Sequence, residues 1–409
     1  MSNDQLSVNA TDRPLLQERP GFDHRDDPGL LYEPWERWNE VRGESRISVR
    51  AYEEYKIWIL SDYDDVRESL QRYDLFTSTN LNVYGPLKAP DLRIIPAEID
   101  PPDQAAYRQM ILSYLSPKRV AEMSPHIRER AVELIESFAG NGHCDLMKDF
   151  SKKFPTYIFM EMLGLPLEDL EQVSQWADMN LHAGSDPDSQ AVAAAVMTQI
   201  HEYLRDLAQK RRANPTDDLI SCLVTSDFNG RKLSDAEVIG YCVTLYLGGL
   251  DTVASEFGFM FHFLAQNPEH RRQLVESPSI IPNAVEEFLR FFSIITLGRT
   301  VAQDVEFKGC PMHVGDRVMI STVAAGRDER EFDDANHVDF NRRLNRHLAF
   351  GAGPHRCIGS HLARAELVIG LEEWHKRIPE YRLGAGDIHR HGGVVLGLGH
   401  LPLEWDLAK

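Results

Sequence analysis

Hydrophobic and polar positions follow a helical period over most of the chain. From about residue 117 to residue 277, apolar residues recur every three to four positions, as in amphipathic helices. Prolines interrupt this pattern at Pro125, Pro155, Pro166 and Pro187. A further helix is predicted from about Ser360 to Arg377. The pattern therefore predicts a mainly α-helical protein.

Short segments with alternating polarity near both ends of the chain predict small β-sheets. The segment "RISVRAYEEYKIWILS", residues 46–61, alternates on both sides of a polar turn and predicts a β-hairpin. Similar short runs follow Arg290 and close the chain over residues 392–406. Helices dominate, so we expect one large, mainly α domain with small β-sheets over residues 21–409. A flexible arm is expected over residues 1–20.

The longest predicted helix, residues 235–266, contains a feature that an ordinary core helix lacks. Gly248 and Gly249 lie at its centre, and each costs about 1 kcal/mol relative to alanine. Asp251 and Thr252 follow them, although a buried carboxylate is expensive unless it is paired or used. One interpretation is a kink in which Thr252 bonds a carbonyl one turn back. The other is that a bound group lies against the glycines and faces both polar side chains.

Composition and charge exclude several classes of protein. Of the 409 residues, 43% are hydrophobic and 26% are charged, which is typical of a soluble globular chain. The formal net charge of −19 argues against binding to nucleic acid or to an anionic membrane surface. No signal peptide and no run of about 18 apolar residues is evident. The five cysteines are scattered and never form a C-x-x-C pair. We therefore expect a cytoplasmic protein with free thiols.

One of these cysteines lies in an unusual setting. In "FGAGPHRCIG", residues 350–359, Cys357 precedes a predicted helix and follows Arg356, and both features are expected to lower the pKa of a thiol. The surrounding glycines permit backbone conformations that other residues avoid. A single cysteine cannot hold zinc or an iron–sulfur cluster, which need three or four protein ligands, but one thiolate suffices for haem. The alternative is a buried cysteine in a glycine turn.

The spacing of this segment resembles the cysteine loop of the cytochrome P450 family, F-x-x-G-x-(H/R)-x-C-x-G. The matching residues are Phe350, Gly353, His355, Cys357 and Gly359. The family's E-x-x-R motif is matched by Glu287 and Arg290, and its (A/G)-G-x-(D/E)-T motif by residues 248–252. The chain is most similar to camphor 5-monooxygenase and its bacterial relatives. The resemblance implies the cytochrome P450 fold and a haem-thiolate monooxygenase.

The resemblance also implies how haem b is held. Cys357 would be the axial thiolate, with Phe350, Gly351 and Gly359 around it. The haem propionates would be bound by Arg108, Arg299 and His355. Glu287 and Arg290 would form an ion pair that, with Arg342, stabilises the haem-binding core. Gly248 would leave room for dioxygen, and Asp251 and Thr252 would relay protons.

The substrate pocket is placed by the resemblance at Leu92, Ile94, Ala97, Leu181, Thr244, Leu247, Ile295, Leu297, Val395 and Leu396. Leu92 stands where camphor hydroxylase has the tyrosine that binds the ketone of its substrate, so camphor is expected to bind poorly. The aliphatic lining predicts a compact hydrophobic substrate such as a terpenoid or a norisoprenoid, for example an ionone. A second departure is His182, which aligns with the arginine that tethers Asp251 in relatives. A histidine tether would make proton delivery sensitive to pH.

The chain has no flavin or nicotinamide motif, so its electrons must come from a partner. By resemblance this partner is a two-iron (2Fe-2S) ferredoxin with its NAD(P)H-dependent reductase. It would dock near Cys357, where Arg72 and Arg108 offer positive charge. Two alternatives remain open: a haem-thiolate sensor of gases or ligands without turnover, and a peroxygenase driven by peroxide.

Overall fold

The computed structural model describes residues 13–84, 93–184 and 186–407. Helices form most of it, as predicted. The α-helices are α1 (Pro28–Tyr32), α2 (Pro34–Glu44), α3 (Tyr63–Gln71), α4 (Asp103–Leu112), α5 (Pro117–Ala139), α6 (Lys153–Leu163), α7 (Leu170–Leu181), α8 (Pro187–Ala213), α9 (Leu219–Thr225), α10 (Asp235–Gly249), α11 (Thr252–Gln266), α12 (Pro268–Glu276), α13 (Ile281–Phe292), α14 (Thr322–Ala325) and α15 (Ser360–Arg377). The π-helix η2 is Met147–Ser151, and the 3₁₀ turns are η3 (Leu167–Asp169), η4 (Pro278–Ile280) and η5 (Gly353–His355).

The strands form one larger sheet and several small ones, as the alternating segments predict. They are β1 (Leu16–Glu18), β2 (Ile47–Ala51), β3 (Lys56–Leu60), β4 (Phe76–Thr77), β5 (His143–Asp145), β6 (Thr296–Val301), β7 (Val305–Phe307), β8 (Cys310–Met312), β9 (Arg317–Ser321), β10 (Arg382–Leu383), β11 (His389–His391), β12 (Gly397–His400) and β13 (Pro402–Glu404). The described strands of the larger sheet follow the order β1-β2-β3-β9-β6-β4. The predicted hairpin is confirmed, since β2 and β3 pair antiparallel from Ile47 opposite Leu60 to Ala51 opposite Lys56.

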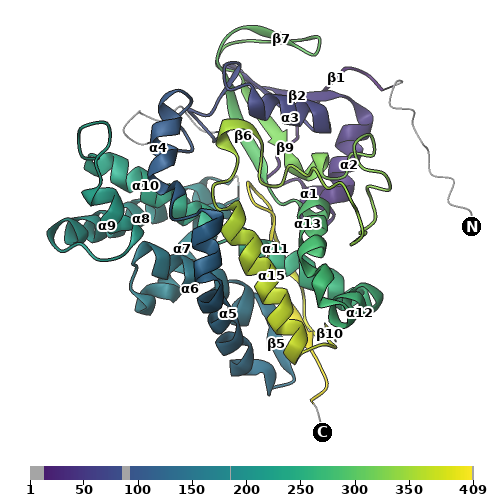
Figure 1. Ribbon diagram of the computed structural model, residues 1–409. Helices are drawn as coiled ribbons and strands as arrows, with labels where there is room; N and C mark the ends of the chain where they lie inside the picture. Colours follow the sequence, from purple (N-terminus) through teal and green to yellow (C-terminus); the bar gives the residue numbers. More distant parts are fainter. Residues whose placement is uncertain (1–12, 85–92, 185, 408–409) are drawn as a thin grey trace, which may run out of the picture.

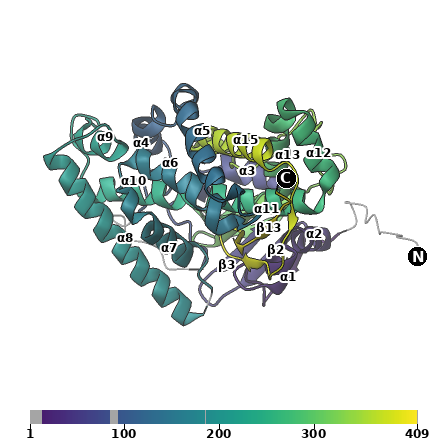
Figure 2. The same cartoon turned by 90° about the horizontal axis from the view of Figure 1, so that it is seen from below.

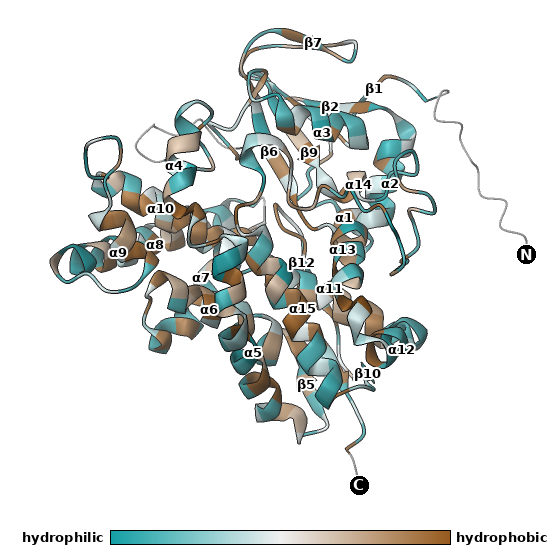
Figure 3. Cartoon of the chain, in the orientation of Figure 1, coloured by the Kyte–Doolittle hydropathy of each residue, from teal (hydrophilic) through white to brown (hydrophobic). Residues whose placement is uncertain are grey.

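The sheet lies on one side of the molecule, and the helices form the larger remaining part (Figure 1). Seen at a right angle to this view, α8 runs along one edge, and α11 lies among the other helices (Figure 2). Hydrophobic residues concentrate in the central helices, whereas the outer loops are mostly hydrophilic (Figure 3). Most residues of α11 are buried. The motif-bearing helix therefore passes through the core.

Two predictions about the elements are wrong. The helix predicted over 235–266 is divided into α10 and α11, because Leu250 and Asp251 interrupt it directly after the glycine pair. The arm predicted over residues 1–20 is wrong for residues 16–18, which form β1 and pair parallel with β2. Hydrogen bonds to a neighbouring strand satisfy the backbone there, and the short polar segment gave no periodic signal for it.

The stretch over residues 235–266 is apolar and long enough to cross a membrane by length and composition. However, 72% of its most apolar window is buried inside the protein. Its hydrophobicity is therefore accounted for by its place in the core.

Candidate active site

The loop that carries Cys357 is shaped by its glycines. Gly351 and Gly353 have φ angles of +67° and +70°, which glycine adopts without strain. At Gly353 a Cβ would lie 2.6 Å from the carbonyl oxygen of Leu70, so no other residue fits there. The backbone N–H of Cys357 donates to the carbonyl of Phe350 over 2.8 Å. The loop thus folds back on itself and leads directly into α15.

Cys357 is exposed, although the protein atoms around its thiol are dense enough to influence its pKa. Burial raises the pKa of its thiol; the amide of Gly359 and the charges of Arg108 and Arg356 lower it, but by less. The expectation of a lowered pKa is therefore wrong for the chain alone. A metal ion deprotonates a thiol that it binds, so the thiolate would come with the iron.

Two of the three motifs lie at the beginnings of helices that run side by side. At Gly370 of α15 a Cβ would lie 2.4 Å from Cζ of Phe257 in α11. One turn further on, the rings of Phe261 and Trp374 are 4.7 Å apart. Because residue numbers increase together along both helices, α11 and α15 run in the same general direction. Their N-terminal ends, with Thr252 and the Cys357 loop, therefore lie toward the same side.

The glycine pair before α11 serves two purposes. At Gly249 a Cβ would lie 2.4 Å from the ring of Phe159, so this glycine permits close packing against α6. Gly248 is exposed although the helix around it is mostly buried, and a Cβ built there would meet no described heavy atom within 4 Å outside its own stretch of helix. The hydroxyl of Thr252 donates to the carbonyl of Gly248 over 3.0 Å, which confirms the bond one turn back. The helix therefore opens onto an accessible space at Gly248.

Asp251 is buried and paired as the sequence predicts. Its carboxylate lies 3.1 Å from Nε2 of His182, and both side chains are about 95% buried. Ser255 donates to the same carboxylate oxygen over 3.3 Å. Burial opposes both charges, but the pair more than offsets this, so the pKa of His182 is raised and that of Asp251 is lowered. The tether is thus an ion pair that contains a titratable cation.

Two of the three residues predicted to bind propionates interact with one carboxylate, that of Asp100. Nε2 of His355 lies 2.9 Å from Asp100, a residue that the sequence motifs do not indicate. Burial lowers the pKa of Arg299 to about 10, although Asp100 opposes this. Arg299 has no ion-pair partner among the described residues, and donates only to the carbonyl of Gly298. Arg108 donates to the carbonyl of Arg356. A buried guanidinium without a carboxylate partner fits an acidic group of a ligand.

The predicted structural cluster is formed fully. Glu287 and Arg290 pair over 2.7 Å with both side chains fully buried. Arg342 reaches the same carboxylate over 3.0 Å, and Asn345 donates to it as well. Asn345 was not predicted, because an isolated asparagine in a loop gives no signal in one sequence.

The predicted pocket residues come together in two groups. Ile94 adjoins Ile95, whose N–H donates to the carbonyl of Gly240 in α10, one turn before Thr244. Ile295 forms a β-bridge with Val395. Leu396 belongs to the second group, since its N–H donates to the carbonyl of Ile294, and Leu297 follows in β6. A Cβ built at Gly393, two residues before Val395, would lie 3.3 Å from the carbonyl oxygen of Leu181. Ala97 and Leu247 each lie three positions along the sequence from Ile94 and Thr244. Leu92 lies outside the described residues.

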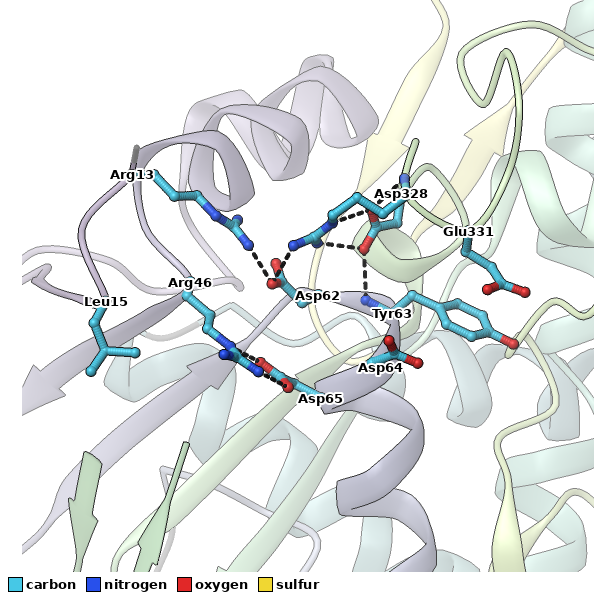
Figure 4. Close-up of a pocket in the computed structure, with 10 residues that line it drawn as sticks. Arg13, Leu15, Arg46, Asp62, Tyr63, Asp64, Asp65, Asp328 and Glu331 are labelled. Carbon is cyan, nitrogen blue, oxygen red and sulfur yellow. Dashed lines mark hydrogen bonds and ion pairs between the residues drawn. The ribbon is translucent and has the colours of Figure 1, made fainter. Parts of the chain in front are cut away.

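A separate cavity of about 420 Å³ lies beside β1 and α3 (Figure 4). It is lined by charged side chains that already pair with one another: Asp62 with Arg13 and Arg330, and Arg46 with Asp65. None of the predicted site residues lines it. It therefore offers few free polar groups to a ligand and is a charged surface hollow.

Comparison with known proteins places this geometry in a family. The family model "Cytochrome P450" matches residues 47–277 and 279–374, which is most of the chain. The chain therefore belongs to the cytochrome P450 family, whose members are haem-thiolate monooxygenases with haem b as cofactor. The resemblance inferred from the three motifs is confirmed at this level.

Relatives and solved structures agree with this assignment. A probable cytochrome P450 127A1 of Sinorhizobium fredii is 35% identical, over 93% of this chain and 88% of the relative. A mycinamicin IV hydroxylase/epoxidase of Micromonospora griseorubida is 31% identical, over 90% and 95%. The crystal structure of CYP101J2 is similar with a TM-score of 0.83 and 31% identity, over 94% of this chain and 96% of that chain. The finer likeness to camphor 5-monooxygenase remains a prediction.

The residues present fit a haem. Cys357 is exposed, a Cβ built at Gly248 would meet open space, and Arg299 is a buried cation without a described ion-pair partner. Cys357 would hold the iron, and Arg299, with Arg108 and His355, would hold the propionates. Phe350 lies under the guanidinium of Arg364, 4.5 Å from its centre, so its ring is fixed beside the loop.

Proposed function

We propose that this cytochrome P450 inserts one oxygen atom of O₂ into a C–H bond of a compact hydrophobic substrate, in the cytoplasm, and that the thiolate of Cys357 would hold the iron of haem b. The observation that carries this proposal is the exposed Cys357 just before α15, which lies toward the same side as Thr252. The P450 motifs at both positions support the same conclusion.

Haem supplies the binding and activation of dioxygen. The chain's own residues would deliver protons and exclude water. Asp251 holds a negative charge inside the core, and its release from His182 would let it pass a proton toward Thr252. The hydroxyl of Thr252 donates to the carbonyl of Gly248, so its oxygen remains able to accept a hydrogen bond from a proton donor. Gly248 leaves room for a small molecule beside this hydroxyl.

The absorption spectrum of the reduced, carbon-monoxide-bound protein tests the proposal. Thiolate ligation predicts a strongly red-shifted Soret band in the native protein. Cys357→Ser should abolish this band, whereas Cys222→Ser, a change at a partly buried cysteine in α9, should leave it unchanged. If Cys357→Ser kept the spectrum, the axial assignment would be wrong. Turnover with hydrogen peroxide alone would favour the peroxygenase alternative, and no turnover with any donor would favour the sensor.

The pocket supports a compact terpenoid or norisoprenoid substrate, such as an ionone. Its described members are aliphatic apart from Thr244, whose hydroxyl already donates to the carbonyl of Gly240 over 3.1 Å. Without a free donor the pocket selects by shape and apolar contact. Ionones should therefore shift the iron spin state at lower concentrations than camphor. Tight camphor binding together with silent ionones would overturn this part of the proposal.

A two-iron ferredoxin with an NAD(P)H-dependent reductase is the proposed electron donor. Arg72 cannot supply the expected free charge, because Asp74 pairs with it over 2.7 Å. Arg356 is exposed and has no ion pair with another described residue, so it replaces Arg72 in the proposed docking surface together with Arg108. The rate of reduction by an acidic ferredoxin should fall steeply as salt is raised. A rate independent of salt would contradict this docking surface.

A further inference from the structure

The imidazole of His391 lies flat against the imidazole of His182, the residue that pairs with Asp251. The ring centroids are 4.4 Å apart and the planes differ by 25°. His391 comes from β11, more than 200 positions further along the chain, and none of the motifs includes it. This contact connects the hairpin of β11 and β12, called the C-terminal hairpin, with Asp251 of the proposed proton relay.

Apart from the contact of Nε2 with Asp251, packing orients the His182 ring. Its Nε2 faces Asp251, but its buried Nδ1 has no hydrogen-bond partner among the described residues. In most functional histidines a bond at the second nitrogen fixes the orientation of the ring. Here the face of the ring is covered by His391 instead.

The position of His391 is determined by its own hairpin. At Gly399 in β12 a Cβ would lie 2.4 Å from Nε2 of His391, so the glycine leaves room for this ring. At Gly397 a Cβ would lie 3.3 Å from Cε1 of His182 and 2.7 Å from Oγ of Ser255. The hairpin thus packs directly against both residues that contact the Asp251 carboxylate.

The charges around the pair favour one charged and one neutral ring. The groups facing them are Asp251 at the start of α11, Asp178 in α7 and Lys152 before α6. Burial lowers the pKa of His391 to about 4, and the charges of His182 and Lys152 act in the same direction. Asp251 raises this pKa and His389 lowers it, each by less. Asp251 raises the pKa of His182. A neutral aromatic face therefore covers a ring that is readily protonated, which is a favourable contact.

We propose that His391 is a positioning residue for the proton relay, since its ring holds His182 in the orientation that pairs Nε2 with Asp251. The inference rests on the proposed function of Asp251. Without the flat ring of His391, His182 would rotate and water would enter, so Asp251 would be tethered for a smaller fraction of the time. The neutral imidazole is needed for its shape and not for proton transfer of its own.

The test measures the titration of His182 in the haem-loaded, reduced and carbon-monoxide-bound protein, by NMR of isotope-labelled histidine rings. His182→Gln assigns the signal. His391→Leu fills the space without a flat ring, and His391→Phe keeps a flat ring that cannot titrate. His389→Leu is the matched control, because His389 lies on the same strand but is exposed.

The expected result is a His182 pKa above 6.5 in the native protein, and a roughly tenfold lower proton affinity of this imidazole in His391→Leu. His391→Phe and His389→Leu should keep the native value. The pH profile of product formed per electron pair should shift to lower pH in His391→Leu and stay unchanged in His391→Phe and His389→Leu. If His391→Leu does not fold, His391→Ala and His391→Met take its place.

An unchanged pKa of His182 in the Leu variant would overturn the proposal, and so would a Phe variant that behaves like the Leu variant. The titration needs no turnover. A protein without monooxygenase activity but with the expected pKa change would therefore contradict the proposed function and leave the positioning role supported.

Discussion

Two buried ionic clusters in this protein are built from different cations. In the first, Glu287 pairs with Arg290 and Arg342, and Arg290 also donates to three backbone carbonyls. In the second, Asp251 pairs with His182, and one nitrogen of that imidazole has no described partner. Arginine keeps its proton at every pH at which a protein folds, whereas histidine exchanges its proton near neutrality.

This difference follows from what each cluster has to do. The Glu287 cluster connects α13 with the loop over residues 337–345, ahead of the Cys357 loop, and a fixed framework requires permanent charge and saturated hydrogen bonds. The Asp251 cluster lies where a proton has to move, and a group that transfers protons has to be released from its partner. Mutation of the Glu287 cluster should therefore have the same effect at any pH. The effect of mutating the Asp251 cluster should depend on pH.

The largest effect is expected on stability, when the Glu287 cluster, called the permanent cluster because its cations are arginines, is broken. Glu287→Ala leaves Arg290 fully buried without a carboxylate, which costs about 3–5 kcal/mol of unfolding free energy. The loss should be the same at pH 6 and pH 9, because arginine as a residue type stays charged in proteins. Urea unfolding of the haem-loaded variant at both pH values measures it.

Glu269→Ala is the control for this variant. Glu269 also pairs with an arginine three residues on, but its side chain is 78% exposed. A change within about 0.5 kcal/mol is expected there. If both variants lost the same stability, the permanent cluster would not have the structural role assigned to it.

The second effect is on activity. Asp251→Asn keeps the shape of the side chain and removes its charge, so product formation should fall about 100-fold. Electron consumption should fall less than product formation, with hydrogen peroxide accounting for the difference. The measurement compares electrons consumed with product formed, in normal and in heavy water.

Ser255→Ala serves as the matched variant, since it removes the second contact to the same carboxylate without changing charge. Its product yield should stay within about twofold of the native value. A loss as large as that of Asp251→Asn would mean that the carboxylate acts through its position and not through its charge.

The first cluster could be predicted from the sequence, and the second only in part. Glu287 and Arg290 are three positions apart on one helix, so their contact follows from helical geometry alone. Likewise the Cys357 loop is one contiguous segment whose glycines already specify its turns. Its thiol pKa was predicted with the wrong sign, because burial depends on the whole fold and outweighed the nearby amides and arginines.

The second cluster combines residues from distant segments, and a single sequence carries no signal for such contacts. His182 was predicted from its alignment with relatives, but His391 and Lys152 were not predicted, since their places depend on how the hairpin and α6 pack. The same holds for Asp100, which meets His355 across 255 positions. Local periodicity specifies elements, whereas these contacts depend on tertiary packing.

A third effect is the pH dependence of stability in His182→Phe. The raised pKa of His182 stabilises the folded protein fully below pH 6.5, and this contribution is lost as the pH rises through the folded value. The lowered pKa of Asp251 contributes above pH 3.8 and is lost as the pH falls through its folded value. The unfolding free energy of the native protein should therefore exceed that of the variant most between about pH 4 and pH 6.5. A tenfold difference in proton affinity between the folded and unfolded states corresponds to about 1.4 kcal/mol of unfolding free energy.

Thermal unfolding from pH 4.5 to pH 9 gives this comparison directly. The difference in Tm between the native protein and His182→Phe should shrink toward pH 9. His143→Phe, at an exposed histidine in β5, should show no such trend. A difference that stayed constant with pH would mean that His182 contributes packing and not charge.

The smallest effect is expected from Lys152→Met. The ammonium of Lys152 pairs with Asp178 and lowers the pKa of both His182 and His391. Its removal also leaves the charge of Asp178 unpaired, and both changes favour protonated imidazole. The proton affinity of His182 should therefore rise by less than about tenfold, in the direction opposite to that expected for His391→Leu. Lys153→Met, at the next residue, is the control for general loss of charge. If Lys152→Met lowered the pKa of His182, the ion pair with Asp251 would depend on Lys152 for its geometry, and the second cluster would be closer to a permanent framework than its histidine implies.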